Sequence, residues 1–376
     1  MCEIFRRRKE DFREGKSVEK AMSLSAEVRT FLSVMTKVYG EPPCAGSSSS
    51  WRPLPYSSRQ RRYLWTDAFG VCNFITLFKE SGGNPLYLDM ADALIEDVHD
   101  TLGRHRDGQC RLDSATNDHP LLGGLRIGKE AEEGEDDGDG QYFHYLTKWM
   151  FALNRMSIAR GNEHYNDLAI ELAKAVHGRF IYDKSKERPR MFWKMNINLT
   201  KPLVKSEGNL DPFDGYMTYR VLAYCCTKSK SILDEEIADL RKIVEAKFEL
   251  YTSYDPLDLG EALWICHWFV DDESKECLGK EDWAVRVSNI SLQALERLFA
   301  AGYFTAHSSK NRLAFREFGT TLSVQVNRLA KLDLWMPRVK EIHAHWSDKL
   351  FKRDKDITPV MYCSSLIPGS FSRGYL

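Results

Sequence analysis

The sequence lacks a long apolar segment. Its longest apolar candidate, 262–270, is interrupted by His267 and falls well short of the roughly 18 residues that a membrane-spanning helix needs. Residues 1–16 are dense in Arg, Lys, Asp and Glu and contain no apolar core of the kind found in a signal peptide. We therefore expect a soluble, cytoplasmic protein with no membrane partner.

The sequence also lacks an excess of charge and a pattern of paired cysteines. Its 53 basic and 54 acidic residues leave no global field that would attract nucleic acid or an anionic membrane. Its nine cysteines include no Cys-x-x-Cys pair, and several lie in apolar helical segments, as reduced thiols do in the cytoplasm. These features favour a small-molecule partner and argue against nucleic acid.

What the sequence does contain is a repeated segment. Each copy has a Gly-Asn pair followed by Tyr, Ala, Leu and Val at steps of four, three and four residues, which places these four side chains on one helical stripe. The Gly-Asn pair is a turn in which a preceding helix can end with positive φ. Each copy is therefore predicted to be the second helix of a hairpin, and the repetition predicts an array of hairpins. The copies comprise Gly83, Asn84, Tyr87, Ala91, Leu94, Val98 and His99, and Gly161, Asn162, Tyr165, Ala169, Leu172, Val176 and His177.

The helical pattern continues along the chain. The predicted elements are a first helix at 17–39 and hairpins that pair 59–81 with 85–104, 142–160 with 164–182, 213–229 with 232–250, 258–270 with 283–301, and 312–331 with 337–350. We expect the tail to residue 376 to close the ring. The total is then about twelve helices, or six hairpins.

This array predicts a single domain at 17–376, since closed repeat folds exceed the usual roughly 100–200 residues without splitting. The charged leader at 1–16 is expected to be disordered. The Ser-, Pro- and Gly-rich segment 41–58 is expected to be flexible, and 105–140 to form a long loop. Large apolar residues alternate with mostly polar ones at 191–199, which predicts a short β segment near 180–200.

Two helix starts carry aromatic residues beside carboxylates, namely Tyr63-Leu-Trp65-Thr-Asp67 and Asp211-Pro-Phe-Asp214-Gly215. Together with the number and spacing of the hairpins, they make residues 59–350 resemble the six-hairpin, or (α/α)6 toroid, superfamily. This superfamily includes glycosidases, polysaccharide lyases and N-acylglucosamine 2-epimerase-like isomerases. The resemblance implies an all-α fold in which six inner helices point one end at a pocket. A solenoid that never closes is the competing topology.

Four carboxylates at expected starts of inner helices are candidates for acid and base catalysis. Glycoside hydrolysis needs two carboxyl groups in one pocket, one protonated and one ionised. Asp67, Asp211, Asp214 and Glu261 have aromatic or apolar neighbours that would desolvate them and raise their pKa. Asp214 and Asp67 are the predicted acid and base. The alternative is that both are helix caps, a common role of Asp.

Two histidines indicate a second chemistry. Isomerases of this superfamily act by proton abstraction and return, which calls for two histidines that face one pocket. His144 and His267 lie on different hairpins, as such a pair would. The alternative is that both are satisfied polar residues on aromatic helix faces.

Four further residues are predicted to bind the substrate. Arg126 and Lys129 lie in a Gly-rich loop whose spacing matches that of a phosphate-binding loop, but Glu130 follows where Ser or Thr should ligate magnesium. We expect this pair to hold a substrate carboxylate or phosphate. Trp193, with Lys194 beside it, lies on the irregular strand and offers a flat face for a sugar ring.

The sequence thus predicts a carbohydrate-active enzyme that hydrolyses a glycosidic or related bond of a sugar or sugar acid. Asp211 and Glu261 complete the expected pocket. A sugar isomerase, or a toroid with a non-catalytic or recruited accessory role, are the alternatives. No metal and no cofactor are expected.

Overall fold

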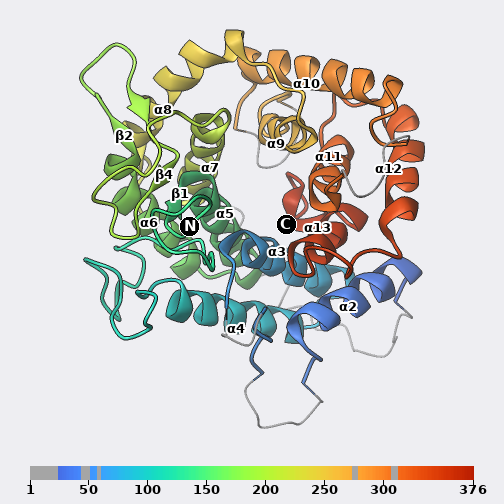
Figure 1. Ribbon diagram of the computed structural model, residues 1–376, viewed down its shortest axis with the longest axis horizontal. Helices are drawn as coiled ribbons and strands as arrows, with labels where there is room; N and C mark the ends of the chain where they lie inside the picture. The colour runs from blue at the N-terminus through green and yellow to red at the C-terminus, as the bar shows by residue number, and fades with distance from the viewer. Residues whose placement is uncertain (1–23, 44–50, 57–60, 273–277, 306–311) are drawn as a thin grey trace.

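The computed structural model describes residues 24–43, 51–56, 61–272, 278–305 and 312–376. It is a ring of helices in two layers (Figure 1). The inner layer consists of α3 (Leu64–Glu80), α5 (Phe143–Arg160), α7 (Asp211–Cys225), α9 (Pro256–Cys266), α11 (Ala314–Val326) and α13 (Ile357–Leu366). The outer layer consists of α2 (Ala26–Tyr39), α4 (Leu86–Thr101), α6 (His164–Phe180), α8 (Asp234–Lys247), α10 (Asp282–Ala300) and α12 (Leu332–Trp346).

The ring is closed by the two ends of the helical array. Helix α13 packs against α3, the first inner helix, and also against α2, which is its outer partner (Figure 1). The first helix and the tail therefore form the sixth hairpin. This closure confirms the predicted all-α toroid over the open solenoid. The predicted leader at 1–16 lies outside the described residues.

The repeated Gly-Asn segments make the same kind of turn. Gly83 and Gly161 both have positive φ, of 91° and 63°. The side-chain oxygens of Asn84 and Asn162 each accept a hydrogen bond from the backbone N–H two residues later, at 3.2 and 3.1 Å. Each turn reverses the chain from an inner helix to an outer one, from α3 to α4 and from α5 to α6.

Short strands connect two of the hairpins, as the alternation near 180–200 predicted. Strand β2 (Ile181–Tyr182) pairs with β3 (Arg190–Met191), and β1 (Gln141–Tyr142) pairs with β4 (Lys194–Met195), both antiparallel. Because β1 leads directly into α5, this pairing brings the segment after β3 to the start of an inner helix.

The segments predicted to be loops are packed where the structure describes them. In the part of 41–58 that is described, Trp51 contacts Phe74 edge to face, with ring centroids 5.9 Å apart. In the loop 105–140, Leu121, Leu125 and Ile127 are buried.

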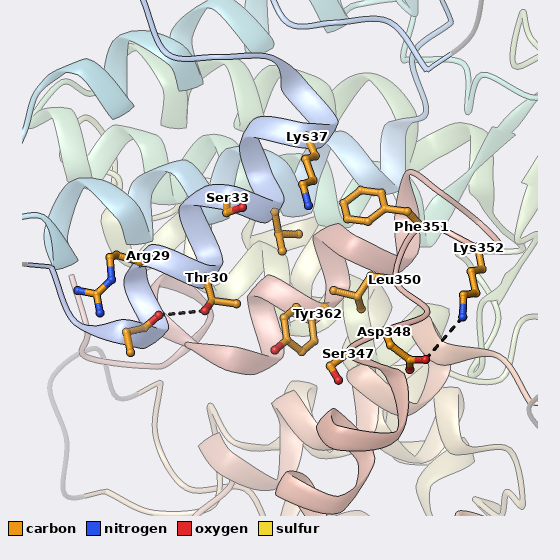
Figure 2. A pocket seen from close by; sticks show the side chains of 12 residues that line it. Arg29, Thr30, Ser33, Lys37, Ser347, Asp348, Leu350, Phe351, Lys352 and Tyr362 are labelled. Carbon is orange, nitrogen blue, oxygen red and sulfur yellow. Dashed lines mark hydrogen bonds and ion pairs between the residues drawn. The ribbon is translucent and has the colours of Figure 1, made fainter.

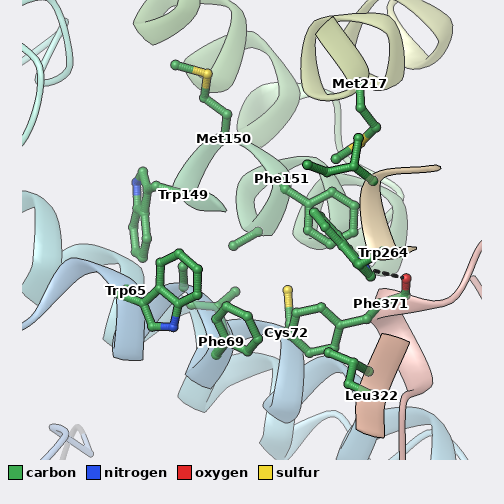
Figure 3. Packing of buried hydrophobic residues seen from close by; sticks show 14 of the residues in the cluster. Trp65, Phe69, Cys72, Trp149, Met150, Phe151, Met217, Trp264, Leu322 and Phe371 are labelled. Atoms are coloured by element: carbon green, nitrogen blue, oxygen red, sulfur yellow. Dashed lines mark hydrogen bonds between the residues drawn. The ribbon is translucent and has the colours of Figure 1, made fainter. Parts of the chain in front are cut away.

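The two layers differ in how much of each helix is buried. Helix α5 is buried without a break from Leu146 to Ala159, whereas outer helix α8 buries only Leu240, Ile243 and Val244. Aromatic side chains fill the centre of the ring (Figure 3). They include Trp65, Phe69, Phe151, Trp264 and Phe371. None of the helices in the described ranges is long and apolar enough to span a membrane.

The chain after α13 crosses the C-terminal ends of the inner helices. The 3-10 helix η3 (Gly369–Phe371) places the carbonyl of Phe371 where the indole N–H of Trp264 donates to it at 3.2 Å. The backbone N–H of Arg373 then donates to His267 Nε2 at 3.2 Å, and its guanidinium pairs with Asp271 at 2.6 Å. The tail therefore packs against the C-terminal end of α9.

The close packing of α9 on α11 predicts that Gly260→Ala destabilises the fold. A Cβ at Gly260 would lie 2.8 Å from backbone atoms of Gly319 and Thr320, which cannot move as a side chain can. We expect a loss of about 1–3 kcal/mol in the free energy of unfolding, measured by urea denaturation. The matched control is Gly178→Ala on α6, where nothing lies within 4 Å of the new Cβ and a gain of about 0.5–1 kcal/mol is expected. Equal stability of the two variants would contradict this packing.

Candidate functional site

One cavity receives residues from all six inner helices. It has a volume of about 160 Å³ and lies at the N-terminal ends of these helices. Helix N-termini carry partial positive charge, so their convergence favours carboxylates at this place. The residues that line the cavity are Trp65, His144, Tyr145, Asn209, Leu210, Asp211, Leu257, Asp258, Glu261, Phe315 and Ile357.

Helix α9 supplies two carboxyl groups to the cavity. Asp255 begins the helix as its N-cap and accepts the N–H of Leu257 at 2.8 Å, with Pro256 in the first turn. Asp258 and Glu261 follow three residues apart, and this spacing puts both on one face of the helix.

The surroundings of Asp258 favour its protonated form. Burial raises its pKa, against the hydrogen bond that the Asn209 amide donates at 3.0 Å, and the Glu261 carboxylate adds to the increase. The hydroxyl of Ser253 also donates to Asp258, at 3.3 Å.

Glu261 belongs to a buried ion cluster below the cavity. The ammonium of Lys148, on α5, lies 2.8 Å from Glu261 Oε1 and 2.8 Å from Asp214 Oδ2, on α7. It also lies 4.7 Å from the centroid of the Trp264 ring and 5.7 Å from that of Trp65. Burial alone would lower the pKa of Lys148, but the two carboxylates outweigh burial and raise it. Lys148 therefore fixes the position of the Glu261 carboxylate.

Asp214 stands behind the cavity. It is fully buried and is not among the lining residues. Thr147 donates a hydrogen bond to its carboxylate, next to the ammonium of Lys148. Burial raises the pKa of Asp214 to about 6, although Lys148 opposes the increase. Asp214 therefore positions Lys148 through their ion pair.

A histidine and an aspartate form a second polar pair on the cavity wall. His144 Nδ1 lies 3.2 Å from Asp211 Oδ1, and both residues are in the first turns of their helices. Burial opposes protonation of His144, but the Asp211 carboxylate outweighs it and the pKa of His144 is raised. The pair thus joins α5 to α7 on the cavity wall.

An aromatic cluster continues from the cavity to the rim. The Trp193 ring lies 6.4 Å from the ring of His144 and 5.1 Å from that of Tyr142, and its indole N–H donates to Ser206 at 3.2 Å. Lys194 is buried with its ammonium 5.0 Å from the centroid of the Tyr142 ring. The β1–β4 pairing thus places Trp193 next to a cavity residue, with Lys194 further inside.

Asp67 lies away from this cavity. Its carboxylate accepts the N–H of Tyr63 at 3.2 Å and a hydrogen bond from the Tyr56 hydroxyl, and Arg62 lies 3.5 Å away. It is fully buried in this network and does not line the cavity. Tyr63, and not Asp67, is the N-cap of α3, and Asp67 lies in the first turn, where it accepts the N–H of that residue.

Arg126 and Lys129 also lie elsewhere. The Arg126 guanidinium pairs with Asp139 at 2.7 Å and donates to the carbonyls of Arg104 and Thr101. Lys129 pairs with Asp137 at 2.6 Å. Both line a separate cavity of about 500 Å³ beside the 105–140 loop.

The two histidines of the isomerase hypothesis lie at opposite ends of the inner helices. His144 is in the first turn of α5, whereas His267 follows the last residue of α9. His267 accepts the N–H of Arg373, and burial lowers its pKa to about 3. His267 Nδ1 also lies within hydrogen-bond distance of the Trp264 carbonyl, and its ring contacts that of Trp268, so its described contacts are at the C-terminal end of α9 and with the tail.

A larger cavity lies in the outer part of the ring (Figure 2). It has a volume of about 760 Å³ and is lined by α2 and by residues near the end of α12, among them Lys37, Phe351 and Lys352. Asp348 is its one carboxylate and lies 3.6 Å from Lys352. Since this cavity offers no pair of carboxyl groups, the central cavity is the better candidate site.

Sequence analysis did not select Asp258, Lys148, Tyr145 or Asn209. Asp258 had a detectable signal, because it lies three residues before Glu261 and just after Asp255-Pro256. Lys148 lies four residues after His144, but the sequence does not reveal that its partners come from α7 and α9. In the described ranges, no group of three or more His, Cys, Asp or Glu is arranged to hold a metal ion.

Comparison with known proteins supports the fold. No family model and no curated protein matches the sequence. Among solved structures, the chain is similar to a family 76 glycoside hydrolase from a bovine Bacteroides thetaiotaomicron strain, with a TM-score of 0.55 and 14% sequence identity. The similarity covers 94% of this chain and 77% of the hydrolase chain. At this identity it shows the fold alone, an all-α toroid of helices.

The environment of Asp67 predicts a pH-dependent contribution to stability. Burial raises the pKa of Asp67 from 3.8 to about 6, so the folded chain binds this proton more tightly than the unfolded chain does. Its stabilising contribution is therefore present below about pH 4 and is lost as the pH rises through about 6. Relative to Asp67→Asn, the wild type should lose about 2.4 kcal/mol of unfolding free energy between pH 4 and pH 7.5 in urea titrations. Asp333→Asn, at an exposed position of α12, is the control, and parallel pH curves for wild type and Asp67→Asn would refute the prediction.

Proposed function

We propose that this protein is a glycoside hydrolase whose reaction takes place in the central cavity. The observation that carries the proposal is the convergence of six inner-helix N-termini on one cavity that contains Asp258 and Glu261 on a single face of α9. Hydrolysis of a glycosidic bond needs two carboxyl groups in different protonation states. The two side chains have different partners, which supports different roles for them.

Asp258 acts as the general acid in this proposal. Burial raises its pKa and so favours the protonated form, which gives its proton to the glycosidic oxygen as the bond from this oxygen to the anomeric carbon breaks. Glu261 is the second carboxylate, fixed by the ammonium of Lys148 at 2.8 Å. It either attacks the anomeric carbon or removes a proton from the water that does so, and water supplies the hydroxyl of the product.

The remaining lining residues bind the sugar. His144, paired with Asp211, donates to a hydroxyl, and the aromatic faces of Trp65 and Tyr145 contact the apolar side of the ring. The volume of about 160 Å³ equals that of about five water molecules at the roughly 30 Å³ each occupies in the liquid. This supports a cavity for one sugar ring, with Trp193 next to the rim for a further part of the substrate.

Substitution of either carboxyl group should remove activity, and thermal unfolding of each variant checks that it is folded. With a panel of α- and β-linked 4-nitrophenyl glycosides and disaccharides, we expect Glu261→Gln and Asp258→Asn each to lower kcat/KM by about 10²–10⁴-fold, the usual contribution of acid–base catalysis. Glu245→Gln, at an exposed position of α8, is the matched control and should retain wild-type activity. The proposal fails if no member of the panel is hydrolysed, or if Glu261→Gln is as active as the control.

A variant of Asp214 tests whether Glu261, which lines the cavity, or the buried Asp214 is the second catalytic carboxylate. Because Asp214 contacts Lys148 but not the cavity, Asp214→Asn should leave KM unchanged and lower kcat by about tenfold or less, well below the effect of Glu261→Gln. Steady-state kinetics of the two variants provide the comparison, with thermal unfolding as the check on folding. Equal loss in both variants would instead make Asp214 part of the reacting group.

A further inference from the structure

A second cavity adjoins the central one. Its volume is also about 160 Å³, and Asn209 lines both cavities. Because the Asn209 amide donates to Asp258 at 3.0 Å, the shared wall is in direct contact with the proposed general acid. The two cavities are therefore adjacent, with Asn209 in the wall between them. The end of α8 and the 3-10 helix η1 (Phe248–Leu250) form the other side of the second cavity.

The two cavities differ in charge. Asp211, Asp258 and Glu261 line the central cavity, whereas Arg188 and Lys247 line the second.

The carboxylate of Glu207 lies near three cations around the second cavity. Arg188 lies 2.7 Å from it, Lys247 lies 3.8 Å away and Arg190 lies 3.9 Å away. The Lys247 ammonium donates to the carbonyl of Gly208 at 2.7 Å. Burial lowers the pKa of Lys247, against the carboxylates of Glu207 and Asp211, and the positive charge of Arg188 adds to the decrease. The cluster retains an excess of positive charge.

An exposed apolar side chain stands beside these cations. Leu250 is 81% exposed and lines the second cavity together with Tyr251. A large apolar side chain with this exposure is available to the apolar face of a sugar ring, while the cations are available to a charged substituent on it.

The cavity beside the 105–140 loop does not share these features. Its cations are matched by nearby carboxylates, since Arg126 pairs with Asp139 and Lys129 with Asp137. It also shares no lining residue with the central cavity.

We propose that the second cavity is a subsite for a sugar ring that bears an anionic group, a carboxylate or a phosphate, next to the ring held in the central cavity. Lys247 and Arg188 bind the anionic group, and Leu250 contacts the ring. The identity of the central cavity as the reacting site rests on the proposed function, but binding of the anionic sugar does not require turnover.

Equilibrium binding tests this assignment. The probes are the neutral, uronic-acid and 6-phosphate forms of glucose, mannose and galactose, titrated calorimetrically into wild type, Lys247→Met and Lys242→Met. Lys242 is an exposed lysine of the same helix and serves as the matched control. In the wild type and in Lys242→Met, at least one anionic form should bind about tenfold or more tightly than its neutral counterpart. Lys247→Met should lose that preference, and thermal unfolding confirms that it is folded.

The remaining outcomes show which anion binds and whether the subsite or the proposed hydrolase activity fails. A preference for the uronic acid or for the phosphate identifies which anion the subsite takes. Equal binding of neutral and anionic forms by the wild type, no binding of any probe, or a preference that persists in both Lys247→Met and Arg188→Met overturns the subsite. Glu261→Gln should keep the preference. If no glycoside is hydrolysed but the Lys247-dependent preference is present, the proposed hydrolase activity fails while the subsite stands.

Discussion

The packing of α13 against α3 is the contact on which the site depends, because it joins the two ends of the helical array. Once the ring is closed, the N-terminal turns of six inner helices meet at one face. At the opposite face, the segment after α13 packs against the C-terminal end of α9 through Phe371 and Arg373. A cavity can therefore form at the N-terminal face, and Trp65 and Ile357, from the first and last inner helices, both line it.

Several carboxylates lie in or next to the cavity, and positive charge from helix N-termini and Lys148 offsets their negative charge. Asp211 and Asp258 lie in first helical turns, where the helix dipole favours a carboxylate. Glu261 and Asp214 share the ammonium of Lys148, which lies near two indole rings. Loss of one partner from a buried ion pair costs about 3–5 kcal/mol, so the cluster that fixes Glu261 is also part of the core. Function and stability are coupled at this point.

Local sequence patterns predicted the hairpins but not which carboxylates face the cavity. The stripes and Gly-Asn turns act over a few residues, so they identify helices in any context. His144, Asp211 and Glu261 were expected near the site and line the cavity, whereas Asp67 and Asp214 occupy similar first turns and do not line it. A helix rotates by about 100° per residue, so a displacement of one to three positions turns a side chain from the cavity to a neighbouring helix.

The sequence by itself determined the helical period, the turns that reverse each hairpin and the placement of aromatic and acidic residues at helix starts. Tertiary structure alone decided that α13 meets α3, that Lys148 reaches partners on both α7 and α9, and that Asn209 separates two cavities of different charge. The physical reason is range. Backbone hydrogen bonds and helical stripes link neighbours in the chain, whereas each of these contacts links segments that come together only when the ring closes.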